Sequence, residues 1–190
     1  MRGMRQSLQG EKNLGEIKPF VREKLIMGVI INEDKLNLDV VTPFLEKEFG
    51  EVDYKSNCID FNFTEYYQDE MGSCLKRYFL SFKNLVDPIK LADIKILSNE
   101  LEIKLSGNSD KRIVNIDPGI ISLGNLILAS TKNFSHRIPL SKGIYAEITL
   151  VYVKGWQHLQ WTFPDYRTEQ YQKVFSEIRT LLYNQRKTQS

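Results

Sequence analysis

The apolar run from Leu25 to Ile31 is the feature of this sequence that most restricts the fold. A helix that crosses a bilayer needs about 20 consecutive apolar residues, so this run is far too short to span a membrane. A short apolar run bounded by polar residues is typical of a strand that is buried on both faces. The sequence therefore predicts a buried β-strand over residues 24–31.

The segments after this strand follow helical and strand patterns in turn. Two helices are expected to begin with a capping residue and a proline, at Thr42-Pro43 and at Asp87-Pro88. Period-two alternation of apolar and polar residues predicts three more strands, over residues 52–63, 76–82 and 111–117. The order strand, helix, strand, strand, helix, strand is that of a split βαβ, ferredoxin-like sheet.

The last third of the chain adds a region rich in hairpins and a final helix. A helix is predicted over residues 123–131, followed by strands over 137–140, 144–153 and 156–161. Apolar residues at helical spacing after Thr168 predict a C-terminal amphipathic helix. We therefore expect an α+β fold with a ferredoxin-like (split βαβ) core, an added β-hairpin region and a C-terminal amphipathic helix, rather than a doubly wound parallel sheet.

Length and charge limit the domain organisation and the partners. A chain of 190 residues suits one domain with a full core. Residues 1–22 show no periodicity and predict a flexible N-terminal arm before a single α+β domain over residues 23–190. The arm lacks the pattern of a secretory signal, which favours a cytoplasmic location. A formal net charge of +2 gives no broad basic field, which argues against nucleic acid as a partner, and the oligomeric state is not indicated.

The stretch GIISLGNLILASTK imitates a phosphate-binding loop. Gly119 and Gly124 have the glycine spacing of the G-x-x-x-x-G-K-[ST] motif, in which backbone N–H groups cradle phosphates and a lysine and a hydroxyl complete the site. Asn125 and Leu126 occupy the positions of that lysine and hydroxyl. Lys132 would lie about 12 Å from Gly124, at the far end of the predicted helix. Walker-type GTP binding is therefore not expected.

Asn115 and Asp117 form the most site-like pair of polar residues. Alternation along the predicted strand places both side chains on one face, near the strand end and before an expected turn at Pro118-Gly119. Two interpretations stay open. Both side chains could satisfy backbone N–H groups of that turn, or Asp117 could be a rigidly held carboxylate for a metal or a substrate hydroxyl.

Three potential cations, Lys132, His136 and Arg137, lie in one loop before a predicted strand. Arginine offers a planar fork and lysine a point charge, so such a loop can bind phosphate or carboxylate, although a solvated loop explains the residues equally well. His136 is one of only two histidines, which essentially excludes a multi-histidine metal site. A role in proton transfer requires a carboxylate beside it.

Glu147, Arg167 and Tyr66 are the remaining candidates. Glu147 lies in the middle of a predicted strand and is either solvated, which is slightly favoured, or a positioned carboxylate. Arg167 follows Asp165 just before the final helix, where a contact between the two is expected to be structural. Tyr66 lies near a short predicted helix, where an aromatic ring more often packs than stacks on a ligand.

Four polar-rich phrases carry a resemblance to a known family: DFNFTEYYQDEMG, RIVNIDPGIISLGNLILASTKNFSHRIPL, GIYAEITLVY and WTFPDYRT. After about residue 24 nearly the whole chain resembles the family called domain of unknown function 4416, from bacteria and archaea. Some members carry a loose GTP-binding label, and the family has no established reaction to transfer. The resemblance implies a grouping of Asp60, Tyr66, Glu70, Asn115, Asp117, Lys132, His136, Arg137, Tyr145, Glu147, Asp165 and Arg167.

Carboxylates beside cations with aromatic walls are the makeup of a polar small-molecule pocket. We therefore expect a pocket for a small anionic or phosphorylated ligand, and leave open whether the protein is an enzyme. Expected roles are anion binding for Lys132, Arg137 and Arg167, binding of a hydroxyl or of a hard cation such as Mg²⁺ for Asp117 and Glu147, proton transfer for His136, and further ligand contact for Asn115 and Tyr66. The alternative is a non-catalytic interaction or assembly module, in which these residues cap turns and a sheet edge or the final helix meets a partner.

Overall fold

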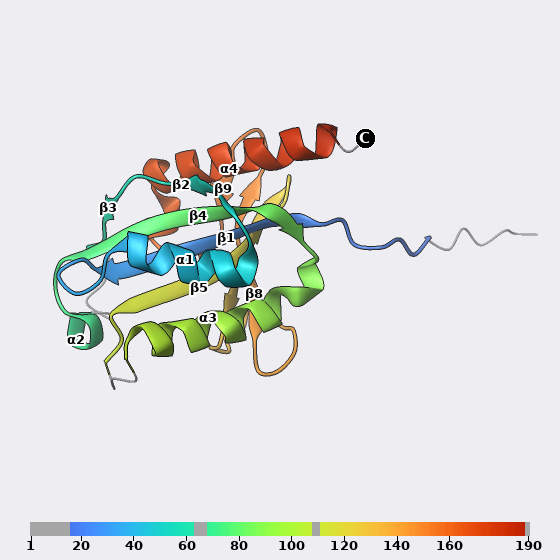
Figure 1. Ribbon diagram of the computed structural model, residues 1–190. Helices are drawn as coiled ribbons and strands as arrows, with labels where there is room; N and C mark the ends of the chain where they lie inside the picture. Colours follow the sequence, from blue (N-terminus) through green and yellow to red (C-terminus); the bar gives the residue numbers. More distant parts are fainter. Residues whose placement is uncertain (1–15, 63–67, 108–110, 189–190) are drawn as a thin grey trace, which may run out of the picture.

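The computed structural model describes residues 16–62, 68–107 and 111–188 and has helices on both faces of one sheet (Figure 1). The strands are β1 (Glu23–Asn32), β2 (Val52–Lys55), β3 (Ile59–Asp60), β4 (Leu75–Val86), β5 (Val114–Ile121), β6 (Asn125–Ser130), β7 (Ile138–Pro139), β8 (Tyr145–Tyr152) and β9 (Trp156–His158). The helices are α1 (Leu38–Phe49), α2 (Gln68–Met71), α3 (Leu91–Leu105) and α4 (Glu169–Lys187), with short 3-10 turns η1 (Pro88–Lys90) and η2 (Asp165–Arg167).

The nine strands follow the order β2-β4-β1-β5-β6-β8-β7, with β3 paired to β4 and β9 paired to β8. Neighbouring strands are antiparallel throughout. Strand β1 lies inside the sheet between β4 and β5, and its side chains from Lys24 to Asn32 are buried, as the apolar run predicts. The α+β class is confirmed, and the sheet is larger than a split βαβ core alone.

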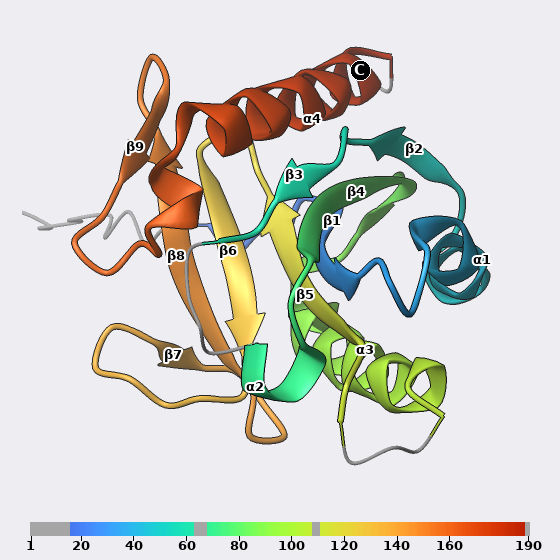
Figure 2. The ribbon, with the colours of Figure 1, turned by 90° about the vertical axis from the view of Figure 1, so that its left-hand side faces the viewer.

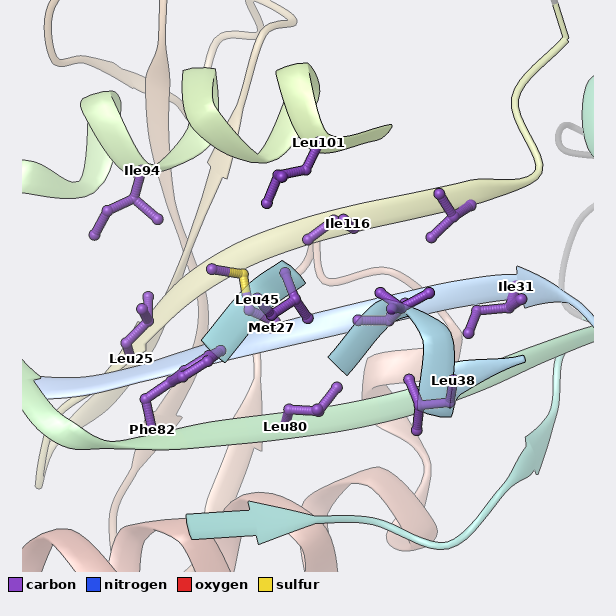
Figure 3. Packing of buried hydrophobic residues seen from close by; sticks show 13 residues of the cluster. Leu25, Met27, Ile31, Leu38, Leu45, Leu80, Phe82, Ile94, Leu101 and Ile116 are labelled. Atoms are coloured by element: carbon purple, nitrogen blue, oxygen red, sulfur yellow. The ribbon is translucent and has the colours of Figure 1, made fainter. Parts of the chain in front are cut away.

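Helices α1 and α3 cover one face of the sheet and α4 covers the other (Figure 2). Successive residues of β1 alternate between the two faces, so Met27 packs toward α1 and α3 while Ile26 packs toward α4. In Figure 3, Leu45 of α1 and Leu101 of α3 point toward the buried side chains of the strands. Burying each such side chain contributes about 1.5–3 kcal/mol to the stability of the fold. These contacts hold α1 and α3 on their face of the sheet.

Capping residues explain where the helices begin. Asp87 caps η1, which leads directly into α3, by accepting the N–H of Ile89 at 3.1 Å, as the Asp-Pro pair predicts. Thr168 caps α4, which confirms the C-terminal amphipathic helix. The predicted start of α1 at Thr42-Pro43 is wrong: the helix begins at Leu38 after Asn37 caps it, so Pro43 lies inside the helix.

The predicted helix over residues 123–131 is wrong, because residues 125–130 form β6. Ser122 lies in the turn between β5 and β6, where its Oγ accepts the N–H of Gly124 at 3.0 Å and that of Asn125 at 2.9 Å. A short apolar run fits a strand and a helix equally well, and pairing with β5 and β8 decides for the strand.

The expected turn at Pro118-Gly119 is also wrong, since β5 continues to Ile121. Gly119 is needed for a close approach between strands: a Cβ there would lie 2.6 Å from the carbonyl oxygen of Ile127 and 2.7 Å from Leu128. The stretch that imitates a phosphate-binding loop is thus a β-hairpin, with one glycine inside a strand and the other in the turn.

Residues 16–22 precede the sheet and are exposed without regular secondary structure. The division into an arm over residues 1–22 and a domain over 23–190 stays a prediction, since residues 1–15 lie outside the described part. In that part, none of the helices combines the length and the apolar character that a bilayer span requires.

Candidate functional site

The sheet divides where β5 begins and β6 ends. The two strands pair only through residues 119–121 and 126–128, so the first half of β5 and the end of β6 separate. In Figure 2 they diverge toward the lower end of the view. A pocket of about 500 Å³ lies at this division, lined on its two sides by Asp117 of β5 and Ser130 of β6.

Side chains of both charges line this pocket, and they come from distant parts of the chain. The charged lining residues are Arg77, Asp117, Lys132, Arg137, Glu147 and Asp165. Phe61, Leu128, Phe163 and Tyr166 supply apolar walls. The pocket therefore has the mixed polar and aromatic lining of a small-molecule site.

Asp117 is held in place by its neighbours. Lys95 of α3 donates to Oδ1 at 3.3 Å, Asn115 donates to Oδ2 at 2.6 Å, and Arg77 Nη1 lies 3.8 Å from Oδ2. Burial raises the pKa of Asp117, but Lys95 and Arg77 outweigh it and bring the pKa below its ordinary value. Asp117 is thus an ionised carboxylate inside a strand, and the interpretation of Asn115 and Asp117 as caps of a turn is wrong.

Arg77 of β4 is the most deeply buried cation of the pocket, with its side chain 3% exposed. Its guanidinium lies over Gly28 of β1, with Nη2 3.5 Å from Asp165 Oδ2 and the ring centroid of Phe61 5.0 Å from its central carbon. Within the described residues, Nε and Nη1 make no hydrogen bond of ordinary geometry, although the hydroxyl of Tyr171 lies near the guanidinium. Arg77 therefore keeps unused donor capacity beside the pocket.

Arg167 fixes the loop that carries Asp165 and Tyr166. Its Nε donates to the carbonyl oxygen of Thr162 at 2.7 Å and its Nη2 to that of Gln160 at 3.0 Å. Burial raises the pKa of Asp165, and the attraction of Arg77 offsets this only in part. Arg167 is not among the pocket's lining residues, so its guanidinium shapes the pocket wall from behind.

Glu147 of β8 is buried, with its side chain 2% exposed, so the slight preference for a solvated side chain is wrong. Its Oε2 accepts from Arg137 Nε at 2.8 Å and lies 3.0 Å from His136 Nε2. Arg137 also donates to Ser130 Oγ at 2.8 Å and to the carbonyl oxygen of Lys132 at 2.9 Å. His136 and Arg137 are therefore bound to Glu147 in one network, which Lys132 joins through its backbone carbonyl.

His136 lies just behind this network. Its ring stacks with that of Trp161 at a centroid distance of 5.1 Å and with that of Phe134 at 5.9 Å. The carboxylate of Glu147 is the neighbour that a proton-transfer role requires. His136 does not line the pocket, so it reaches a ligand only through Glu147.

A second network connects the start of β5 to two helices. Arg112 donates to both carboxylate oxygens of Glu70 at 2.7 Å, and its Nη1 donates to Glu102 at 2.9 Å and to Asn115 at 3.1 Å. Glu102 in turn accepts the backbone N–H of Ile116 at 2.7 Å. Through Asn115 this network also fixes the carboxylate of Asp117.

The structure brings four of the sequence-predicted candidates to one pocket: Asp117, Lys132, Arg137 and Glu147. Asn115 and His136 each contact one of them, Arg167 supports a pocket wall, and Tyr66 lies outside the described residues.

Arg77 and Lys95 were missed by the sequence analysis, and Asp165 was expected to have only a structural role until the family resemblance grouped it with the other candidates. A glycine inside the buried run of β1 was the one signal for a close approach at that point, but it does not name Arg77 as the side chain that approaches.

No group of three or more His, Cys, Asp and Glu side chains in the described part of the chain is arranged to hold a metal ion. Asp117 and Glu147, from which a Mg²⁺ site was expected, are bound to different cations, Lys95 and Arg137.

Comparisons with known proteins identify the family of the chain. No curated protein and no solved structure matches it significantly. The family model described as domain of unknown function (DUF4416) matches residues 21–182, a range that contains all strands of the sheet and the whole pocket. The chain therefore belongs to this family of unknown function.

Proposed function

We propose that the pocket binds a small anionic ligand. The observation that carries this proposal is Arg77, which is almost fully buried beside the pocket while Nε and Nη1 make no hydrogen bond of ordinary geometry within the described residues. A buried donor without a partner costs about 1–3 kcal/mol, and the contacts of the guanidinium with Asp165 and with the rings of Phe61, Phe79 and Tyr166 do not satisfy these two donors. An anion in the pocket would reduce that cost, because arginine binds carboxylate and phosphate strongly.

The other two cations that line the pocket, Lys132 and Arg137, would act on the anion less directly than Arg77. Lys132 is exposed at the pocket rim and would attract the anion as it enters. Arg137 would contribute mainly its positive field, since its nitrogens already bind Glu147 and Ser130. A volume of about 500 Å³ admits a ligand larger than inorganic phosphate.

Mg²⁺ would bind in the pocket only together with the ligand. Mg²⁺ is commonly bound through one or two carboxylates plus ligand phosphates rather than by an all-protein cage. Asp117 would be the protein ligand, because its carboxylate is the more exposed of the two from which a Mg²⁺ site was expected. Binding assays with and without MgCl₂ separate this form of the proposal from metal-free binding.

Thermal unfolding with a panel of anions tests the proposal. A ligand that binds only the folded state stabilises it by about 2.7 kcal/mol at a hundredfold excess over Kd, and the melting temperature keeps rising with the logarithm of the ligand concentration. The panel contains inorganic phosphate, citrate and ribose 5-phosphate, with sulfate at equal ionic strength to control for general salt effects. We expect a concentration-dependent shift beyond that of sulfate in the wild type, a smaller one in Lys132→Ala and none in Arg77→Met.

The matched control is Lys173→Ala, which removes an exposed lysine of α4 and leaves the pocket lining unchanged. This variant should respond as the wild type does. The proposal fails if no anion in the panel gives a shift beyond that of sulfate, or if all three variants respond equally.

A second candidate function, a non-catalytic interaction module, is favoured by a different observation. Phe134, Ile138 and Leu140 are exposed at and beside β7, a strand at the sheet edge. Exposed apolar side chains at an edge are typical of interaction surfaces. Sedimentation velocity tests whether the chain self-associates and whether Ile138→Lys abolishes this. A monomer at all concentrations would leave the ligand proposal as the better one.

We also infer a ferredoxin-like core within the larger sheet. The consecutive order β2-β4-β1-β5 supports this inference, together with the placement of α1 and α3 on one face. Two interleaved βαβ units give this order and leave both helices on one face. Nuclear Overhauser contacts between backbone protons that give a different strand order would refute it.

A further inference from the structure

Asp117 is the carboxylate that a ligand in the pocket can reach. Its side chain is 27% exposed, whereas those of Asp165 and Glu147 are 8% and 2% exposed. Glu147 is also occupied by Arg137 and His136 through its Oε2. Any hydrogen-bond donors on the ligand therefore meet Asp117 first.

The carboxylate of Asp117 keeps acceptor capacity on both oxygens. An ionised carboxylate has about four lone-pair sites. Oδ1 accepts from Lys95 and Oδ2 from Asn115, while Arg77 Nη1 is 3.8 Å away, too far for a hydrogen bond. Two adjacent acceptors fixed on one carboxylate match two donors on neighbouring atoms of a ligand.

The charge around Asp117 favours hydroxyl donors over an ammonium group. Lys95 Nζ at 3.3 Å and Arg77 Nη1 at 3.8 Å already balance the negative charge of the carboxylate. A ligand ammonium would lie close to both cations and be repelled by them, whereas a hydroxyl carries no net charge. Neutral donors on adjacent carbons, which form a vicinal diol, therefore suit this site best.

The opposite side of the pocket favours an anionic group. Asp117 lines the β5 side, and Lys132, which follows β6, lines the other side of the division. Phe61 and Phe163 add aromatic surface, against which the C–H face of a sugar ring packs well. The lining thus combines a diol acceptor, an apolar wall and a cationic rim.

We propose that the ligand is a sugar phosphate, whose adjacent ring hydroxyls donate to Oδ1 and Oδ2 of Asp117 and whose phosphate is held by Arg77 and Lys132. This inference rests on the proposed function, because it specifies which anion the same pocket holds. It assigns Asp117 to the recognition of hydroxyl groups, and Arg77 and Lys132 to the recognition of the phosphate.

Titration calorimetry with the full chain tests the assignment through a matched pair of probes. Ribose 5-phosphate has adjacent hydroxyls on its ring, whereas the ring form of 2-deoxyribose 5-phosphate has none. Loss of one hydrogen bond to a charged acceptor lowers affinity by about tenfold to a hundredfold, so ribose 5-phosphate should bind more tightly by that factor. Inorganic phosphate is the third probe and reports binding of the anion alone.

Asp117→Asn should remove the preference between the two sugar phosphates while binding of the deoxy compound persists. Lys132→Ala should weaken both compounds by the same factor. Asp93→Asn is the matched control, since Asp93 forms an exposed ion pair with Lys142 and does not line the pocket. It should keep the wild-type preference.

The outcomes separate the inference from the proposed function. Equal binding of the two sugar phosphates by the wild type overturns the inference and leaves anion binding intact, and this comparison needs no variant to fold. A preference that survives in Asp117→Asn also overturns it. If none of the three probes binds the wild type, the inference fails, and the proposed function fails with it if citrate gives no thermal shift either.

Discussion

Gly28→Ala is expected to disturb the pocket through packing alone. Gly28 lies in β1 opposite Asp117 of β5, and the guanidinium of Arg77 passes directly over it. A Cβ at this position would lie 2.8 Å from Arg77 Nη1, 3.2 Å from the hydroxyl of Tyr166 and 3.3 Å from a ring carbon of Phe79. The first distance is shorter than such contacts allow, so the guanidinium must move away from its two carboxylates.

Two opposing effects set the size of the change. Replacing a strand glycine by alanine stabilises a fold by about 0.4–1 kcal/mol where there is room, because the unfolded chain loses conformational freedom. Overpacking a buried site costs about 1–3 kcal/mol, and it wins here because Arg77 is almost fully buried. We expect a net loss of about 1–2 kcal/mol, measured as a lower midpoint of urea unfolding at an unchanged m-value.

Gly124→Ala, in the turn between β5 and β6, is the control with an uncrowded glycine. A Cβ there would meet only Ser122 Oγ, at 4.0 Å, so the control should be neutral or slightly stabilising. A double-mutant cycle with Arg77→Met identifies the clashing side chain: the cost of Gly28→Ala should fall by more than about 0.5 kcal/mol when the guanidinium is absent. The reasoning is refuted if Gly28→Ala is as stable as the wild type, or if its cost is the same in both backgrounds.

Three further changes test the charges of the site, all through urea unfolding. Asp117→Asn should destabilise the fold at neutral pH, because Lys95 and Arg77 hold the pKa of Asp117 below its ordinary value of 3.8. That stabilisation exists above pH 3.8 and is lost as the pH falls through the lowered pKa, so variant and wild type should converge in acid. Asp165→Asn should show the opposite trend. Burial raises the pKa of Asp165 above its ordinary value of 3.8. The stabilisation that Asp165 contributes is therefore present below pH 3.8 and is lost as the pH rises through the raised pKa. The variant should gain stability relative to the wild type toward neutral pH. Parallel trends for the two variants would contradict these assignments. Arg112→Lys should cost about 1–3 kcal/mol, because lysine cannot reproduce the paired bonds to Glu70 together with the bond to Glu102. Lys83→Ala, which breaks an exposed ion pair with Glu51, should keep its free energy of unfolding within about 1 kcal/mol of the wild type. An equal loss of stability in both variants would refute the role of the paired bonds from Arg112 to Glu70.

Local patterns were sufficient where a single segment determines its own structure. The apolar run of β1, the Asp87-Pro88 start and the spacing of α4 all carry their signal within a few residues. The apolar run of β6 does not, because its length fits a strand and a helix equally well. Its state depends on pairing with β5 and β8, which no pattern inside the run contains.

The site was predictable only in part for a similar reason. Asp117 and Arg137 stood out as charged residues beside predicted strands, and the pocket includes both. Arg77 lies within a strand that is recognised by its apolar residues. Its approach to the pocket depends on the register that sets Gly28 of β1 beside β4. The burial of Glu147 depends on Arg137, which comes from a loop ten residues earlier.

Side chains of α3 pair with the backbone of β5 where the sheet divides. One of them, Lys95, also positions Asp117. An unpaired strand edge normally seeks a partner, since orphaned backbone groups are costly when buried. Along the first half of β5, Glu102 accepts the N–H of Ile116 at 2.7 Å and Lys95 donates to its carbonyl oxygen at 2.9 Å. Pro118, two residues further on the same edge, has no N–H to satisfy. Strand β6 is therefore free to diverge without leaving these groups of β5 unpaired, and Asp117, between Ile116 and Pro118, faces the resulting pocket.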